Sequence, residues 1–174
     1  MAQGDSRVEV LELRVHELKQ LFDSMDPSPF RERDLDPHAE EFIVGWAREL
    51  HTGTTPALTV RVEAGASPEE AALLQEAVSE FFRNRAQVKR RELHRLLRYG
   101  RISLLIGLAF ITVALVVSDL LSGLRYSIVR ESVVIGAWVA LWRPLEIFLY
   151  DWWPIRAEAR LNDRLAAARV EIAP

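Results

Sequence analysis

Few side chains in this sequence have the types and spacing for chemistry: it contains four histidines and no cysteine. His16 and Glu17 begin the pattern in which two histidines one helical turn apart bind zinc and a glutamate acts as the base. The position of the second histidine holds Gln20. The other histidines are scattered, without the spacing of a metal-ligand set. The sequence therefore predicts no metal and no cofactor.

Loops that bind phosphate or present a nucleophile are also missing from the sequence. The eight glycines do not fall in the pattern of a phosphate-binding loop or a serine nucleophile elbow. There is no thiol, and no set of titratable residues is expected to converge on one point. We therefore expect the protein not to be an enzyme.

Two apolar stretches predict helices that cross a membrane. Residues 102–124 contain one ionisable residue, Asp119, and as a helix would extend over roughly 35 Å. The second stretch, residues 132–153, contains Pro144, which removes a helical hydrogen bond, so we predict a crossing that is kinked there. The alternative is a crossing that ends near Trp142, followed by a helix that lies in the headgroup layer.

Charged residues inside these stretches are candidates for a functional role, and they are Asp119, Arg143 and Glu146. Glu146 follows Arg143 by one helical turn, so we predict that it neutralises Arg143. If the two spans end at the same depth, Asp119 and Arg143 lie roughly 12 Å apart along the hairpin axis, and we expect no pairing between them. Asp119 is instead expected to meet Arg125 or Arg130.

Charge is segregated along the chain. Residues 1–82 contain 7 Lys and Arg against 17 Asp and Glu, and residues 83–101 contain 8 against 1, which gives net charges of −10 and +7. A basic segment beside a membrane span predicts that this side faces the cytoplasm, and the C-terminal arginines return to the same side. We expect anionic lipid headgroups, not nucleic acid, to contact the basic segment, because no stacking aromatic residues are interleaved with it. The expected headgroup contacts are Lys89, Arg90, Arg91, Arg95, Arg98 and Arg101.

The acidic N-terminal part contains two predicted strands. Residues 57–63 alternate between apolar and polar side chains, which is typical of a half-buried strand. Residues 8–15 fit both a strand and a heptad-spaced helix. We predict a strand that becomes a helix near His16, because a single strand at 57–63 would have no pairing partner.

Two helix starts are also marked in this part. Asp36 precedes a proline and a helix whose predicted buried face includes Phe42 and Ile43. Ser67 opens a capping box before a second helix, which contains Leu73. No glycine or proline interrupts residues 69–99, so the second helix is predicted to continue through the basic segment into the membrane.

The charged loop before the first helix has two interpretations. It contains two prolines and the side chains of Phe30, Arg31 and Arg33. It is either a solvated connection pinned to the core by Phe30, or a surface that binds a protein partner.

Small residues four apart in the spans predict close helix packing. Ser103 and Gly107 form one such pair and Gly136 and Ala140 form another, and equal span ends place the two pairs at different depths. We therefore expect Gly136 and Ala140 to pack against a neighbouring chain in a homo-oligomer.

Two segments resemble a group of small uncharacterised bacterial membrane proteins. They are the loop DPSPFRERDLD at 26–36, with Phe42, Ile43 and Trp46 after it, and the segment WRPLEIFLYDWWP at 142–154. The similarity covers most of the chain. It implies a multi-pass protein of the bacterial inner membrane with a shared architecture, and it implies no activity, cofactor or site residue.

The predicted fold class is an α+β cytoplasmic domain followed by a transmembrane helical hairpin. The domain, residues 1–82, has two short strands and two to three helices. A basic juxtamembrane helix follows over 83–101, the hairpin over 102–154, and a basic helical cytoplasmic tail over 155–174. Both termini are expected in the cytoplasm.

The predicted function is that of a membrane-anchored scaffold or adaptor without enzymatic activity. It would act through homo-oligomerisation or an unidentified protein partner, in contact with membrane lipids. The alternative is a subunit of an oligomeric channel or transporter that uses Asp119, Arg143 and Glu146.

Overall fold

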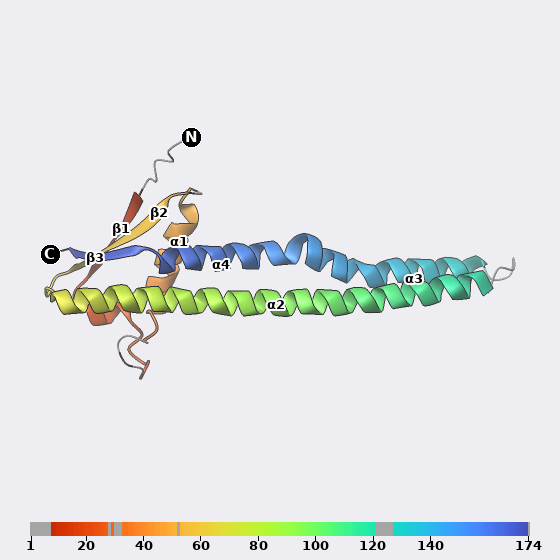
Figure 1. The fold of residues 1–174 in the computed structure, drawn as a ribbon, viewed down its shortest axis with the longest axis horizontal. Helices are drawn as coiled ribbons and strands as arrows, with labels where there is room; N and C mark the ends of the chain where they lie inside the picture. The colour runs from red at the N-terminus through yellow and green to blue at the C-terminus, as the bar shows by residue number, and fades with distance from the viewer. Residues whose placement is uncertain (1–7, 28, 30–32, 52, 121–126, 174) are drawn as a thin grey trace. The chain divides into compact units, whose positions relative to one another are not determined.

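The computed structural model describes residues 8–27, 29, 33–51, 53–120 and 127–173. It contains one parallel sheet in which β2 (Thr55–Val62) lies between β1 (Val8–Val15) and β3 (Arg169–Ala173), as Figure 1 shows. The spatial order of the strands is also their order in the sequence. Because parallel neighbours need a crossover, each connection must return from one end of the sheet to the other.

The two predicted strands are confirmed, and a third was missed. β1 ends at Val15 and is followed by the short 3-10 helix η1 (Leu18–Leu21). Helix α4 (Trp152–Ala166) ends before β3, so the prediction of a helical tail over 155–174 is wrong for residues 169–173. The apolar alternation in β3 extends over only five residues, and its partner strand lies far away in the sequence, so the local pattern was weak.

The outer edge of β3 is closed by one side chain of helix α2 (Pro68–Leu120). The Gln75 amide donates to the Ala168 carbonyl over 3.1 Å and accepts from the Val170 N–H over 2.6 Å. A neighbouring strand would satisfy these backbone groups in the same way, so Gln75 takes the place of a fourth strand at this edge.

The helix starts are those expected from the sequence. In α1 (Pro37–Glu49), the Asp36 carboxylate accepts from the His38 N–H over 2.9 Å. At the start of α2, the Ser67 N–H donates to Glu70 Oε2 over 2.8 Å and the Glu70 N–H donates to Ser67 Oγ over 3.2 Å. Hydrogen bonds from the Ser67 backbone and side chain lower the pKa of Glu70, because they stabilise its carboxylate.

The hydrophobic core lies on one face of the sheet. Alternate β2 residues are buried, and they pack in one cluster with side chains of every neighbouring helix, including Leu58, Ile43, Phe82 and Leu165. The expectation that Phe42 is buried is wrong: Phe42 is exposed, because α1 presents the adjacent residue Ile43 to the sheet. On α2, Leu73 is exposed and the adjacent Leu74 is buried.

The chain divides into two compact units. The first comprises residues 1–88 together with 158–174, and the second comprises 89–157. The first unit therefore extends beyond the predicted boundary at residue 82 and includes the C-terminal strand. Its two parts are connected through the second unit, so the sheet domain is discontinuous in sequence.

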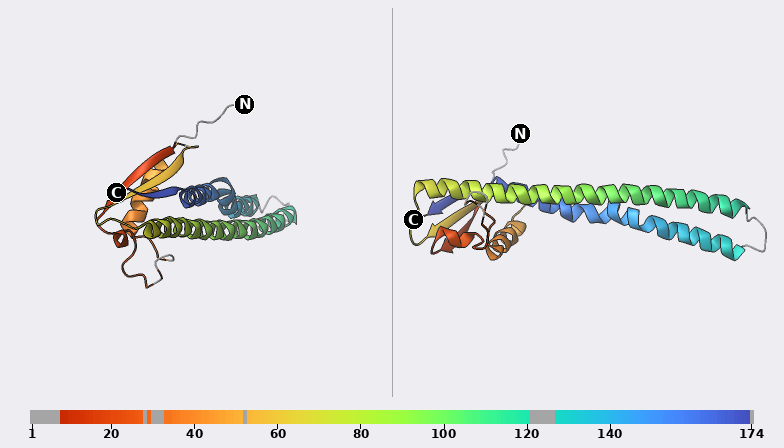
Figure 2. Two further views of the ribbon diagram at one scale, coloured as in Figure 1. Left: turned by 60° about the vertical axis from the view of Figure 1, so that its left-hand side comes forward. Right: turned by 90° about the horizontal axis from the view of Figure 1, so that it is seen from below.

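The second unit is an antiparallel helical hairpin. The later part of α2 and α3 (Ser127–Glu146) lie side by side in both views of Figure 2. α3 contains Pro144 and continues without a break into a π-helical turn, η4 (Ile147–Asp151), and then into α4. Pro144 cannot donate a helical hydrogen bond to the Ala140 carbonyl, and the π turn begins three residues after it. The kink at Pro144 stays a prediction.

Candidate functional site

Two glycines of α2 lie in close contact with the helix that faces them. A Cβ atom added to Gly107 would lie 2.9 Å from Leu141 Cδ2, and one added to Gly100 would lie 2.9 Å from Ile147 Cγ2. Gly100, Gly107 and Ala114 recur at every seventh residue and are all buried. This spacing keeps small residues on one stripe of the helix and allows the two backbones to approach closely.

These contacts fix the relative depth of the two helices. Counting along both helices from the contact between Gly100 and Ile147 places Arg143 level with about Leu104, and Asp119 level with about residue 128. The assumption that the spans end at the same depth is wrong by about seven residues, or roughly 10 Å. The offset between the two spans depends on which side chains fit against the glycines. A hydropathy pattern contains no information about this fit.

The corrected depth changes the interpretation of the second small pair. The Ala140 carbonyl oxygen would lie 3.4 Å from a Cβ atom at Gly107, so Ala140 belongs to the contact within the hairpin. The expectation that the two small pairs lie at different depths is therefore wrong. At Gly136, an added Cβ atom would meet nothing nearer than Phe110 Cε1 at 4.0 Å, so this position has room for a larger side chain.

The predicted ion pair in the second apolar stretch is present. Arg143 Nη1 lies 2.8 Å from Glu146 Oε2 and 3.4 Å from Asp151 Oδ2. These side chains remain 61%, 42% and 30% exposed, so the cluster is not buried within the chain. Asp151 was missed because side chains that meet on a helix are expected three or four residues apart, whereas Asp151 follows Arg143 by eight.

Asp119 lies apart from this cluster. It is exposed on α2, and the corrected register separates it from Arg143 by about 15 residues, or roughly 22 Å along the hairpin. This agrees with the expectation that the two do not pair. The expected partners of Asp119, Arg125 and the side chain of Arg130, lie outside the described residues.

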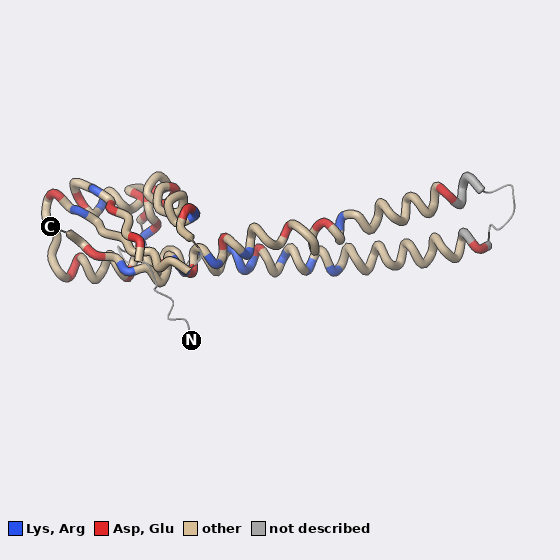
Figure 3. Tube along the Cα trace, turned by 90° about the horizontal axis from the view of Figure 1, so that it is seen from above, with Lys and Arg blue, Asp and Glu red and all other residues tan. Residues whose placement is uncertain are grey.

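The basic segment divides into paired and unpaired cations. Arg83 pairs with Glu80 over 2.8 Å, Arg85 pairs with Glu40, and Lys89 pairs with Glu92 over 3.2 Å. In contrast, four exposed arginines have no carboxylate within ion-pair distance among the described residues, and these are Arg91, Arg95, Arg98 and Arg101. Figure 3 shows the concentration of Lys and Arg along this stretch of α2, next to a stretch without charge.

The loop proposed as a partner surface is held at both ends. Phe22 and Leu35 form an isolated antiparallel bridge, and the Asp36 N–H donates to the Leu21 carbonyl over 2.9 Å. Arg33 is half-buried, whereas Phe30 and Arg31 lie outside the described residues. Partner binding by this loop stays a prediction.

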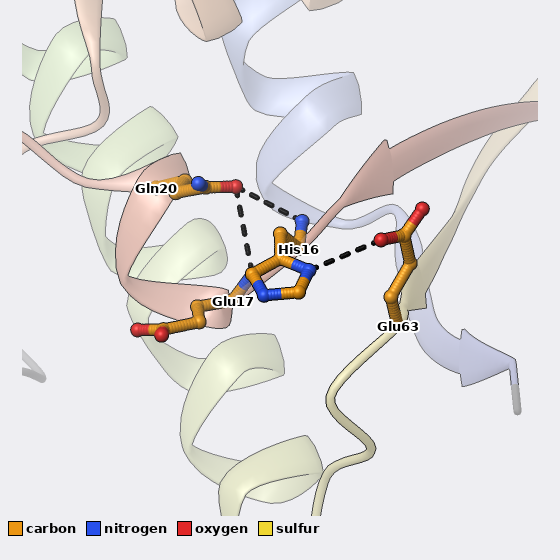
Figure 4. Close-up of polar contacts among 4 residues, drawn as sticks. All are labelled: His16, Glu17, Gln20 and Glu63. Carbon is orange, nitrogen blue, oxygen red and sulfur yellow. Dashed lines mark hydrogen bonds and ion pairs between the residues drawn. The ribbon is translucent and has the colours of Figure 1, made fainter.

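One polar contact that sequence reasoning missed joins the carboxyl ends of β1 and β2. His16 Nδ1 lies 3.0 Å from Glu63 Oε2, and both side chains are exposed (Figure 4). Gln20 Oε1 accepts from the His16 N–H over 2.9 Å and from the Glu17 N–H over 3.4 Å. The segment that begins like a zinc helix is therefore a capping turn. Among the described residues, no group of three or more His, Cys, Asp or Glu could hold a metal ion.

Two helical stretches are long and apolar enough to cross a membrane, by length and composition. They lie within Pro68–Val117 and Glu131–Ala166, and only 17% of each apolar window is buried inside the chain. In comparisons with known proteins, no family model, no curated protein and no solved structure matches this chain.

Proposed function

We propose that this protein is an integral membrane scaffold or adaptor whose two-helix anchor connects neighbouring strands of a cytoplasmic sheet. One observation carries the proposal: β2 pairs directly with β3, Ala57 to Arg61 opposite Arg169 to Ala173, and the apolar hairpin lies between them in sequence. Two strands that pair must lie on the same side of a bilayer. The intervening chain therefore crosses the membrane an even number of times.

The low burial of both apolar windows supports membrane insertion. A core helix of a soluble domain would be covered by its own chain, and here most of each window is not. The basic segment before the first span supports a cytoplasmic location for the sheet domain, by the positive-inside rule. The proposed location in a bacterial inner membrane rests on the resemblance of the loop and of the WRPLEIFLYDWWP segment to small bacterial membrane proteins.

A non-enzymatic role rests on the nature of the polar groups. The contact between His16 and Glu63 is exposed to solvent, where water competes for both groups and a substrate would not be enclosed. Self-association or binding of a protein partner is supported by large apolar side chains left exposed on α3, notably Trp138 and Trp142. A channel lined by all three charges is less well supported, because Asp119 and Arg143 lie towards opposite ends of the hairpin.

Cysteine accessibility tests this topology, because the chain has no native cysteine. Single cysteines at Gln3 and Asn162 should resist an impermeant thiol reagent in intact cells and react after the membrane is permeabilised. A cysteine at Ser127, at the start of α3, should react in intact cells. Labelling of Gln3 or Asn162 in intact cells would contradict the proposal.

A further inference from the structure

The four unpaired arginines of the basic segment share one face of α2. At about 100° per residue, Arg91, Arg95, Arg98 and Arg101 fall within an arc of about 120°. Gly100, which packs against Ile147, lies about 160° from the centre of that arc. The arginines therefore point away from the helix that packs against α2.

The charge of this face is not neutralised by the described part of the chain. Glu92 is the carboxylate within the segment, and it pairs with Lys89, which lies on the side of the helix near Gly100. Four guanidinium groups are thus left in contact with solvent or with an external anion. A planar guanidinium group can donate two parallel hydrogen bonds to one phosphate group.

Distance from the apolar span separates the four arginines into two pairs. At 1.5 Å per residue, Arg101 and Arg98 lie within about 6 Å of Ile102 along the helix axis, and Arg95 and Arg91 lie about 10 and 16 Å away. The attraction of a cation to anionic headgroups falls off within a screening length of about 8 Å at physiological salt. Only Arg98 and Arg101 are well within that range.

We propose that Arg98 and Arg101 form a binding site for the headgroup phosphates of anionic phospholipids in the cytoplasmic leaflet. The inference rests on the proposed function, because it needs the apolar stretch after Arg101 to lie in the bilayer. Each arginine near the surface contributes about a fivefold gain in affinity, so the pair contributes about 25-fold. Lys89, named in the sequence prediction of headgroup contacts, is excluded from the site by its pairing with Glu92.

Binding is measured on the full chain in a neutral detergent, by titration with a short-chain phosphatidylglycerol and detection through the tryptophan fluorescence. The variant Arg98→Gln with Arg101→Gln should bind about 25-fold more weakly. The matched control, Arg91→Gln with Arg95→Gln, removes the same charge from the same face and should lose less than about threefold. Circular dichroism checks that both variants keep the wild-type helix content.

Equal losses in the two variants would overturn the site, because they would indicate diffuse attraction to the whole face. Titration with inorganic phosphate and with phosphatidylcholine should show no saturable binding. If inorganic phosphate saturates the site with the same affinity as the lipid, the proposal that the ligand is a phospholipid is wrong. Membrane insertion is tested separately by alkaline carbonate extraction of wild-type membranes, so a failure of the proposed anchor is distinguished from a failure of the arginine site.

Discussion

Replacing Gly107 with alanine tests the packing register of the hairpin. The added Cβ atom would lie 2.9 Å from Leu141 Cδ2, a separation that real Cβ atoms essentially never show. Either Leu141 changes rotamer or the helices separate. The substitution Gly136→Ala is the matched control, because its Cβ atom would lie 4.0 Å from Phe110 Cε1, an ordinary contact distance.

The expected magnitude follows from two opposing effects. Alanine is favoured over glycine in a helix by about 1 kcal/mol, and this gain applies at both positions. An extra methyl group in a tightly packed contact costs about 1–3 kcal/mol, and this cost applies only at Gly107. Gly107→Ala should therefore be about 1–3 kcal/mol less stable than Gly136→Ala. Adding Leu141→Ala removes the opposing atom and should recover about 1 kcal/mol of that difference.

The assay is reversible unfolding of the purified chain in mixed micelles of increasing denaturing detergent, followed by tryptophan fluorescence. Trp138 and Trp142 lie exposed on α3, and their surroundings change when the hairpin unfolds. The four proteins Gly107→Ala, Leu141→Ala, the double variant and the wild type form a double-mutant cycle. If the two substitutions are additive within about 0.3 kcal/mol, Gly107 does not face Leu141 and the register is wrong.

Four further predictions test other contacts. Glu146→Ala should lower the unfolding free energy in detergent by less than about 1 kcal/mol, because its partner Arg143 lies level with about Leu104, at the headgroup end of the hairpin where water reaches the pair. A loss of about 3–5 kcal/mol would indicate a pair buried away from water. Gln75→Ala should lower the unfolding free energy by about 1–3 kcal/mol and speed hydrogen exchange at the Val170 amide. Gln87→Ala, at an exposed position of the same helix, is the control and should change neither quantity. The pKa of Glu70 is lowered in the folded state, so the stability added by its carboxylate is complete above the unfolded pKa and is lost as the pH falls through the folded pKa. The difference in unfolding free energy between wild type and Glu70→Gln should therefore shrink over that pH range. A difference that does not change with pH would contradict the assignment. Gly136→Leu should lower the oligomer mass in mild detergent without preventing membrane insertion, and an unchanged mass would show that Gly136 is not in the interface between chains.

Local signals in the sequence were sufficient for the elements that depend on neighbouring residues. The caps at Asp36 and Ser67 and the alternation in β2 depend on contacts within a few residues. The uninterrupted helix through the basic segment follows from the lack of glycine and proline before Gly100. These features need no knowledge of the rest of the fold.

The features that were missed depend on residues far apart in the sequence. β3 is stabilised by pairing with β2 and by the side chain of Gln75, and neither is visible in its own five residues. The hairpin offset depends on the fit of Leu141 and Ile147 against glycines. One signal was available and not used: Gly100, Gly107 and Ala114 recur every seven residues, which predicts a close helix contact along that stripe.

The central claim is that the hairpin connects two paired strands, and a disulfide between those strands tests it most directly. Thr59 of β2 lies opposite Glu171 of β3, and directly opposite residues have the spacing that a disulfide needs. In native membranes, oxidation of Thr59→Cys with Glu171→Cys should link the two peptides within one chain, as read by mass spectrometry after proteolysis. Thr59→Cys with Arg169→Cys, two residues out of register, should link far less. Equal linking of both pairs, linking only between chains, or none at all would contradict the account.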